Sequence, residues 1–91
     1  MTKQSPLSIH EAISSSLFQV AMTLEHEGKV HQALTPYLKI IEQYPGTSQA
    51  PSAVEKVMAI ADRMRQNGQC HVAMRVYDRL EKASEQGSES D

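Results

Sequence analysis

The chain has 91 residues, a length that suits one domain and leaves no room for two. Nine basic and eleven acidic residues give a net charge of -2, so we expect neither a general nucleic-acid binder nor a protein held on an anionic membrane. A single cysteine excludes an internal disulfide and a cysteine-rich zinc site. Because no apolar run approaches the ~20 residues of a membrane span and no secretory signal is visible at the start, we expect a cytoplasmic protein without membrane insertion.

Four stretches with helical periodicity follow one another along the chain. Their apolar residues recur at steps of three and four, whereas the period-two alternation of strands is missing. The last residues are rich in Ser and Glu and carry no apolar side chain, which favours disorder. We expect a flexible N-terminus over 1–7, one helical domain over 8–84 with helices at about 8–27, 30–44, 50–67 and 70–84, and a disordered acidic tail over 85–91.

The helix ends carry recognisable signals. Ser8 and Glu11 form a capping-box pattern, in which each side chain can satisfy a backbone amide at the start of the first helix. Gly28 and Gly68 follow the first and third helices, where a left-handed residue favours glycine. Within the second helix, Pro36 removes a backbone donor, and we expect a kink on a solvated face, with a functional bend as the alternative.

The start of the third helix is open between two possibilities. Ser48 can cap it with Pro51 in the first turn, or Ser52 can open a second capping box with Glu55.

The first two helices match the last two when the sequence is shifted by 40 residues. Apolar positions stay apolar and the turn glycines coincide. A repeat of this length in a helical chain is typical of stacked helix-turn-helix units. The matched pairs are Leu17 with Val57, Val20 with Ile60, Ala21 with Ala61, Leu24 with Met64, Gly28 with Gly68, Ala33 with Ala73, Tyr37 with Tyr77, and Ile40 with Leu80.

This spacing resembles the tetratricopeptide repeat (TPR). The first unit carries that family's pattern as Leu17, Ala21, Gly28, Ala33, Tyr37 and Pro45, and the second departs from it at Glu85, where the terminal proline would stand. The link from Tyr44 to Ala53 is similar to that of bacterial outer-membrane assembly lipoproteins and Tol-Pal system proteins. Over residues 14–83, the resemblance implies an all-α, TPR-like α-solenoid fragment with two helix-turn-helix repeats and four antiparallel helices.

The resemblance also implies a non-catalytic adaptor or scaffold that binds a partner peptide or helix in a groove lined by the first helix of each unit. The periodicity leaves these residues for the groove: Ser15, Phe18, Met22, Glu25 and His26 in the first unit, and Glu55, Met58, Asp62 and Arg65 in the second. Phe18, Met22 and Met58 would be apolar anchors, and they stand where the carboxylate-binding members of the family have Lys and Asn. The alternative is that Phe18 and Met22 are ordinary core residues.

Catalytic and metal chemistry find little support. Glu25 and Glu27 are two residues apart and point to different sides of a helix, which makes a poor acid–base pair. The histidines show no i, i+4 pair on one helix, and Cys70 and His71 are adjacent and diverge. We therefore predict that the protein is not an enzyme and has no cofactor and no metal site. A small helical enzyme or metal carrier remains as a minor alternative.

A second hypothesis for function follows from the small number of repeats. About three are normally needed to cover a core, and two leave the outer face of the fourth helix, with Val72, Met74 and Val76, short of cover. The chain would then be a self-associating structural subunit, either a homo-oligomer or part of a larger complex. The basic residues of the second unit fit a solvated face with local pairs such as Asp78–Lys82, with a weak site for an acidic partner as the alternative.

Overall fold

The computed structural model describes the backbone of residues 6–88 and the side chains of residues 9–83. Within this part of the chain there are four helices and no strand, which confirms the all-α prediction. The last helix continues past the predicted end at residue 84 to Ser88, and the rest of the predicted flexible ends, 1–5 and 89–91, lies outside the described residues. The helices are α1 (Pro6–His26), α2 (Val30–Gln43), α3 (Ala50–Gln66) and α4 (Cys70–Ser88).

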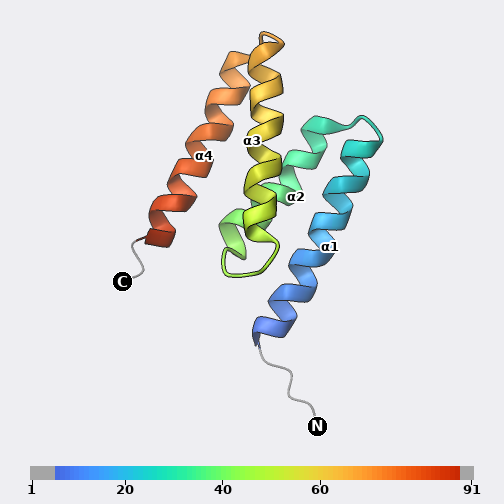
Figure 1. Ribbon diagram of the computed structural model, residues 1–91, viewed down its shortest axis with the longest axis vertical. Helices are drawn as coiled ribbons and strands as arrows, with labels where there is room; N and C mark the ends of the chain where they lie inside the picture. Colours follow the sequence, from blue (N-terminus) through green and yellow to red (C-terminus); the bar gives the residue numbers. More distant parts are fainter. Residues whose placement is uncertain (1–5, 89–91) are drawn as a thin grey trace.

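Consecutive helices run antiparallel and lie side by side in a flat array (Figure 1). α2 packs against both α1 and α3, and α3 packs in turn against α4. As a result α2 is covered on two sides, whereas α1 and α4 lie at the two edges of the array.

One hydrophobic core joins the four helices. Ala21 and Ala33 lie between α1 and α2, Ala61 and Ala73 lie between α3 and α4, and all four have 0% exposure. Small side chains at these positions let the helix backbones approach closely. The larger fully buried side chains include Tyr37, Ile40, Val57 and Ile60.

The two tight turns have the same construction. Gly28 has a φ of 83° and Gly68 a φ of 87°, so both predicted left-handed positions are confirmed. In each turn the next amide closes the helix end: Lys29 N–H donates to the Leu24 carbonyl at 2.8 Å, and Gln69 N–H donates to the Met64 carbonyl at 2.8 Å. An added β-carbon would meet no atom within 4 Å at either glycine, so the backbone conformation alone favours glycine there.

The link between α2 and α3 is held against α1. The hydroxyl of Ser14, fully buried on α1, donates to Thr47 Oγ1 at 3.0 Å, and the Thr47 hydroxyl donates to the Tyr44 carbonyl at 2.8 Å. The Glu11 carboxylate accepts bonds from the Ser48 amide at 2.9 Å and the Ser48 hydroxyl at 2.8 Å. These bonds fix the direction in which α3 leaves the first unit.

Three local predictions are wrong at this level of detail. Because α1 begins at Pro6, Ser8 lies inside the helix and does not stand at the N-cap position that the capping box requires. α3 begins at Ala50 after Gln49, which makes no side-chain cap, so neither predicted serine caps it. Pro36 is buried within an unbroken α2 rather than on a solvated face, because it falls on the same stripe as Ala33 and Tyr37.

Candidate functional site

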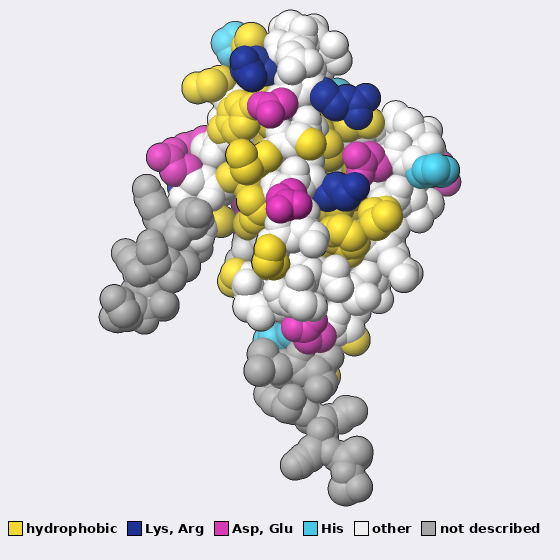
Figure 2. Space-filling model, in the orientation of Figure 1, with side chains coloured by type: hydrophobic (Ala, Val, Ile, Leu, Met, Phe, Trp, Pro, Cys, Tyr) yellow, Lys and Arg dark blue, Asp and Glu magenta, His cyan; other side chains and the backbone are white. Residues whose placement is uncertain are grey.

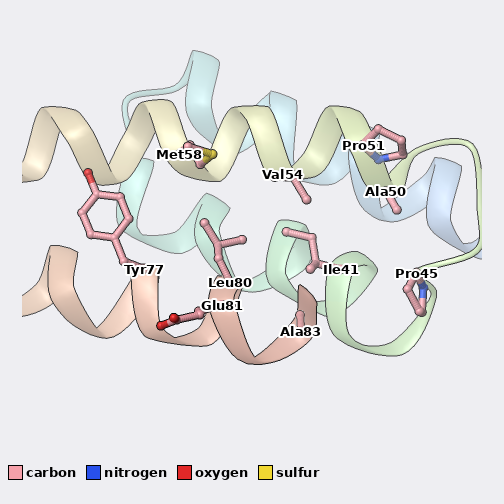
Figure 3. A pocket seen from close by; sticks show the side chains of 10 residues that line it. All are labelled: Ile41, Pro45, Ala50, Pro51, Val54, Met58, Tyr77, Leu80, Glu81 and Ala83. Carbon is pink, nitrogen blue, oxygen red and sulfur yellow. The ribbon is translucent and has the colours of Figure 1, made fainter. Parts of the chain in front are cut away.

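A hollow lies between α3 and α4, beside the end of α2 (Figure 3). Its volume is about 470 Å³ and its lining is mostly apolar. We call it the α3–α4 pocket. Its lining residues are Ile41, Pro45, Ala50, Pro51, Val54, Met58, Tyr77, Leu80, Glu81 and Ala83.

Apolar side chains from both helices converge on this pocket. Val54 extends from α3 toward α4, and Tyr77 and Leu80 extend from α4 toward α3 (Figure 3). Met58 of α3 also lines the pocket. Met58 is 47% exposed, so a substantial part of its thioether chain remains open to an incoming group. Figure 2 shows hydrophobic side chains gathered along the seam between α3 and α4, with charged side chains beside them.

A polar group borders the pocket at Tyr77. The Tyr77 hydroxyl donates a hydrogen bond to the Asp62 carboxylate, and Arg65 Nη2 lies 3.6 Å from the same Asp62 oxygen. Three side chains from two helices therefore orient one another at one border of an otherwise apolar hollow. The border carries both an acid and a base.

A second, smaller hollow lies between α1 and α3. We call it the α1–α3 groove; its volume is about 270 Å³ and it is lined by Met22, Glu25, His26 and Lys56. The Glu25 carboxylate accepts a hydrogen bond of 2.9 Å from the Tyr37 hydroxyl. Burial, and then the hydrogen bond and negative charge of Glu25, raise the pKa of the Tyr37 phenol well above its ordinary value. Glu25 therefore has a structural role in addition to its place on the groove.

The structure divides the predicted groove residues between these two hollows. Met22, Glu25 and His26 meet Lys56 in the α1–α3 groove, and Met58 lines the α3–α4 pocket near Asp62 and Arg65. Phe18 is half-buried and packs edge-on against Tyr37, with ring centroids 5.5 Å apart. Ser15 is half-buried and Glu55 is exposed.

The expected continuous apolar strip does not form, since neither hollow is lined by all three of Phe18, Met22 and Met58. Phe18 and Met58 occupy equivalent positions in the two units. Each is placed near the tyrosine of its own unit, Tyr37 or Tyr77, so the two side chains serve separate places.

Sequence reasoning missed the contribution of α4 to the pocket. The repeat matched Tyr77 and Leu80 with Tyr37 and Ile40, and neither was placed among the predicted groove residues. The repeat could have indicated that these two positions on α4 are less covered than their equivalents on α2. The first unit has a neighbouring helix, α3, to cover these positions, whereas α4 is the last described helix.

The two units consequently differ in burial at equivalent positions. Tyr37 and Ile40 on α2 are each 0% exposed, whereas Tyr77 and Leu80 on α4 are only half-buried. In the first unit, Ser14 is fully buried and contacts Thr47 of the link. Its equivalent in the second unit is Val54, which lines the open pocket. The α3–α4 pocket is thus an open surface at positions whose equivalents in the first unit are covered.

The opposite edge of the array exposes an apolar, uncharged helix face. We call it the α1 outer face; it contains two shallow hollows of about 340 and 390 Å³, and α1 carries no charged side chain between Glu11 and Glu25. Val20 is 52% exposed on this face, whereas its equivalent Ile60 on α3 is 1% exposed. The residues that line the two hollows are Ala12, Ile13, Ser16, Leu17, Gln19, Val20, Thr23 and Leu24.

The outer face of α4 differs from the predicted self-association surface. Val76 is 5% exposed and belongs to the core, and Val72 is half-buried, so Met74 alone of the three stays well exposed, at 64%. The predicted pair of Asp78 and Lys82 does form, at 3.5 Å between exposed groups.

The described residues contain no group of three His, Cys, Asp or Glu side chains placed to hold a metal ion. None of the helices in the described range is both long enough and apolar enough to cross a bilayer. No family model, curated protein or solved structure matches the chain.

Proposed function

We propose that this protein is a non-catalytic protein-binding module that receives an apolar helix face of another polypeptide in the α3–α4 pocket. The proposal includes a TPR-like arrangement of its two helical hairpins. The observation that carries it is the difference between equivalent surfaces: Tyr37 and Ile40 lie beneath a packed helix, while Tyr77 and Leu80 border an open hollow.

The chemistry of the pocket supports a helix as its ligand. Met58 and Leu80 offer apolar surface along a seam between two helices, and a flexible thioether adapts to partners of different shape. Burial of such surface is worth roughly 25 cal/mol per Å², which makes its removal from water the main source of affinity. The border of Tyr77, Asp62 and Arg65 offers polar groups that would orient the bound segment.

The α1–α3 groove supports a secondary role in orientation. Met22 is 44% exposed there, between the exposed His26 and the half-buried Lys56. A partner that extends beyond the pocket would meet this mixed surface. The charged groups of this groove would contribute to selectivity more than to affinity, because exposed ion pairs contribute little net free energy of binding.

A capture experiment tests this function. The full chain, its Met58→Lys variant and a Met74→Lys control are immobilised in equal amounts, and proteins retained from a cell extract are quantified by mass spectrometry. Both substitutions add one positive charge at an exposed methionine, but only Met58 lines the pocket. We expect specific partners to be retained by the wild type and the control and to be reduced at least about tenfold on the pocket variant, since a charge buried at an apolar interface is costly.

Circular dichroism first establishes that all three proteins have the same helical content. Retention of the same proteins at the same level by the Met58→Lys variant would contradict a binding role for the pocket.

A further inference from the structure

We infer that the α3–α4 pocket receives the α1 outer face of a second copy of this chain, so that copies stack head to tail and continue the repeat between molecules. The inference rests on the proposed function, because it names one occupant of the same pocket. The way in which the chain already packs two of its own units supports this occupant.

The junction between α2 and α3 provides the template. Ala53 and Ile60 are 0% and 1% exposed, and α3 packs on α2 as well as on α4. A shift of 40 residues takes these two positions to Ile13 and Val20 on α1, which are 37% and 52% exposed. α1 thus carries apolar residues at the positions that are buried in α3, but it has no preceding helix to cover them in the described chain.

The complementary half of the junction is the α3–α4 pocket. The surface of α2 that bears Tyr37 and Ile40 corresponds to the surface of α4 that bears Tyr77 and Leu80. One chain therefore presents both halves of one interface. The α1 outer face lies at one edge of the molecule, and the α3–α4 pocket lies at the other. Because the two halves lie on different surfaces, association between copies is heterologous.

Charge distribution favours the α1 outer face as the occupant. α1 is free of charged side chains from Ala12 to Leu24, so this face brings no ion into the hollow, and Glu81 is the one charged residue among those that line the pocket. On α4, by contrast, exposed Met74 is next to exposed Arg75 and close to exposed Asp78. Burying that face would require desolvation of charges.

The geometry also sets how far association proceeds. Each added copy leaves one free α1 outer face and one free α3–α4 pocket at the ends of the stack. The assembly therefore grows beyond a dimer, as an open stack or as a closed ring, with rising protein concentration.

Mixing of two blocked variants tests the inference. Val20→Lys places a charge on the α1 outer face, and Met58→Lys places the same charge in the pocket; both positions are about half exposed, so the folded monomer tolerates them. Sedimentation equilibrium over a concentration series measures the mass of the wild type, of each variant and of their equimolar mixture. Met74→Lys is the matched control, since Met74 is 64% exposed and outside both surfaces.

We expect the mass of the wild type and the control to rise past that of a dimer, and each blocked variant alone to stay a monomer. The mixture should form a one-to-one complex and stop there, because it retains a single intact pair of surfaces. Leu80→Ala, which removes apolar surface from the pocket without adding a charge, should weaken association in the same direction as Met58→Lys.

Three results would overturn the inference: a wild type that is monomeric throughout, a Val20→Lys or Met58→Lys variant that associates like the wild type, or a mixture that fails to associate although the wild type does. The capture experiment separates this failure from that of the proposed function. A monomeric protein that still retains partners through Met58 loses only the second copy as an occupant, whereas retention that is insensitive to Met58→Lys contradicts the helix-binding pocket as well.

Discussion

Replacing the equivalent residues Ile60 and Val20 by alanine should have very different effects on stability. Ile60→Ala removes three buried carbons, worth about 0.8 kcal/mol each, and leaves a cavity, for a total of about 2–5 kcal/mol. Val20→Ala removes two carbons that are about half exposed, a loss of roughly 0.8 kcal/mol, and the higher helix propensity of alanine offsets about half of it.

The free energy of unfolding should therefore fall strongly for Ile60→Ala and change by less than about 0.5 kcal/mol for Val20→Ala. Urea unfolding followed by circular dichroism, at a protein concentration where the chain is monomeric, measures both values. Since each kcal/mol shifts Tm by about 4–8 °C in a chain of this size, Ile60→Ala should also lower Tm by at least about 8 °C. A Val20→Ala variant that is destabilised as much as Ile60→Ala would refute the reasoning, because it would place the α1 outer face in the core of the monomer.

Three further predictions concern the contacts that hold the units together. Glu11→Ala should lower the free energy of unfolding by about 1 kcal/mol, because the link loses two hydrogen bonds, whereas Ala at exposed Glu55 should leave it nearly unchanged; urea titration compares the two. The folded-state pKa of Tyr37 is raised, so its contribution to stability is complete below its unfolded pKa of about 10 and is lost as the pH rises above that value. Tyr37→Phe should therefore be less stable at neutral pH but lose less stability between pH 9 and pH 11 than the wild type, and equal slopes would contradict this cause. The paired hydrogen bonds of Arg79 to Glu42, each 2.9 Å, should give a coupling of up to about 1 kcal/mol in a double-mutant cycle that weakens in high salt; zero coupling at low salt would remove this pair from the account.

The sequence predicted those features of the fold that depend on local chemistry. Periodicity located four helices, and the two glycines located turns with positive φ. The repeat matched Ala21 with Ala61, and both are fully buried. Each of these follows from the backbone geometry of one residue or from the spacing along one helix.

Features that depend on distant segments were harder to predict. Glu11 fits a capping box by its distance from Ser8, but α1 begins earlier and the carboxylate instead accepts bonds from Ser48, 37 residues away. Pro36 was expected at the surface because proline weakens helices, yet the stripe of α2 that faces the core includes it. No local pattern contains the position of the partner helix that decides such contacts.

The candidate site was predicted in part for the same reason. The methionines Met22 and Met58 were predicted as apolar anchors of a groove, and both are exposed, at 44% and 47%. Both were assigned to a single groove, but in the structure they line different hollows. The reason is that the first helix of each unit lies against the tyrosine of that same unit. The pocket depends on the absence of a packed helix beside Tyr77 and Leu80, which became visible only when the burial of the two units was compared.

A dilution series of amide NMR spectra tests the account most directly, because it locates every surface that becomes buried as copies meet. The account predicts concentration-dependent shifts in two separate groups of residues, around Ile13 and Val20 on the α1 outer face and around Met58 and Leu80 in the α3–α4 pocket, while Met74 stays unchanged. Spectra that are identical at all concentrations, or shifts confined to one of the two surfaces, would contradict head-to-tail stacking through the pocket.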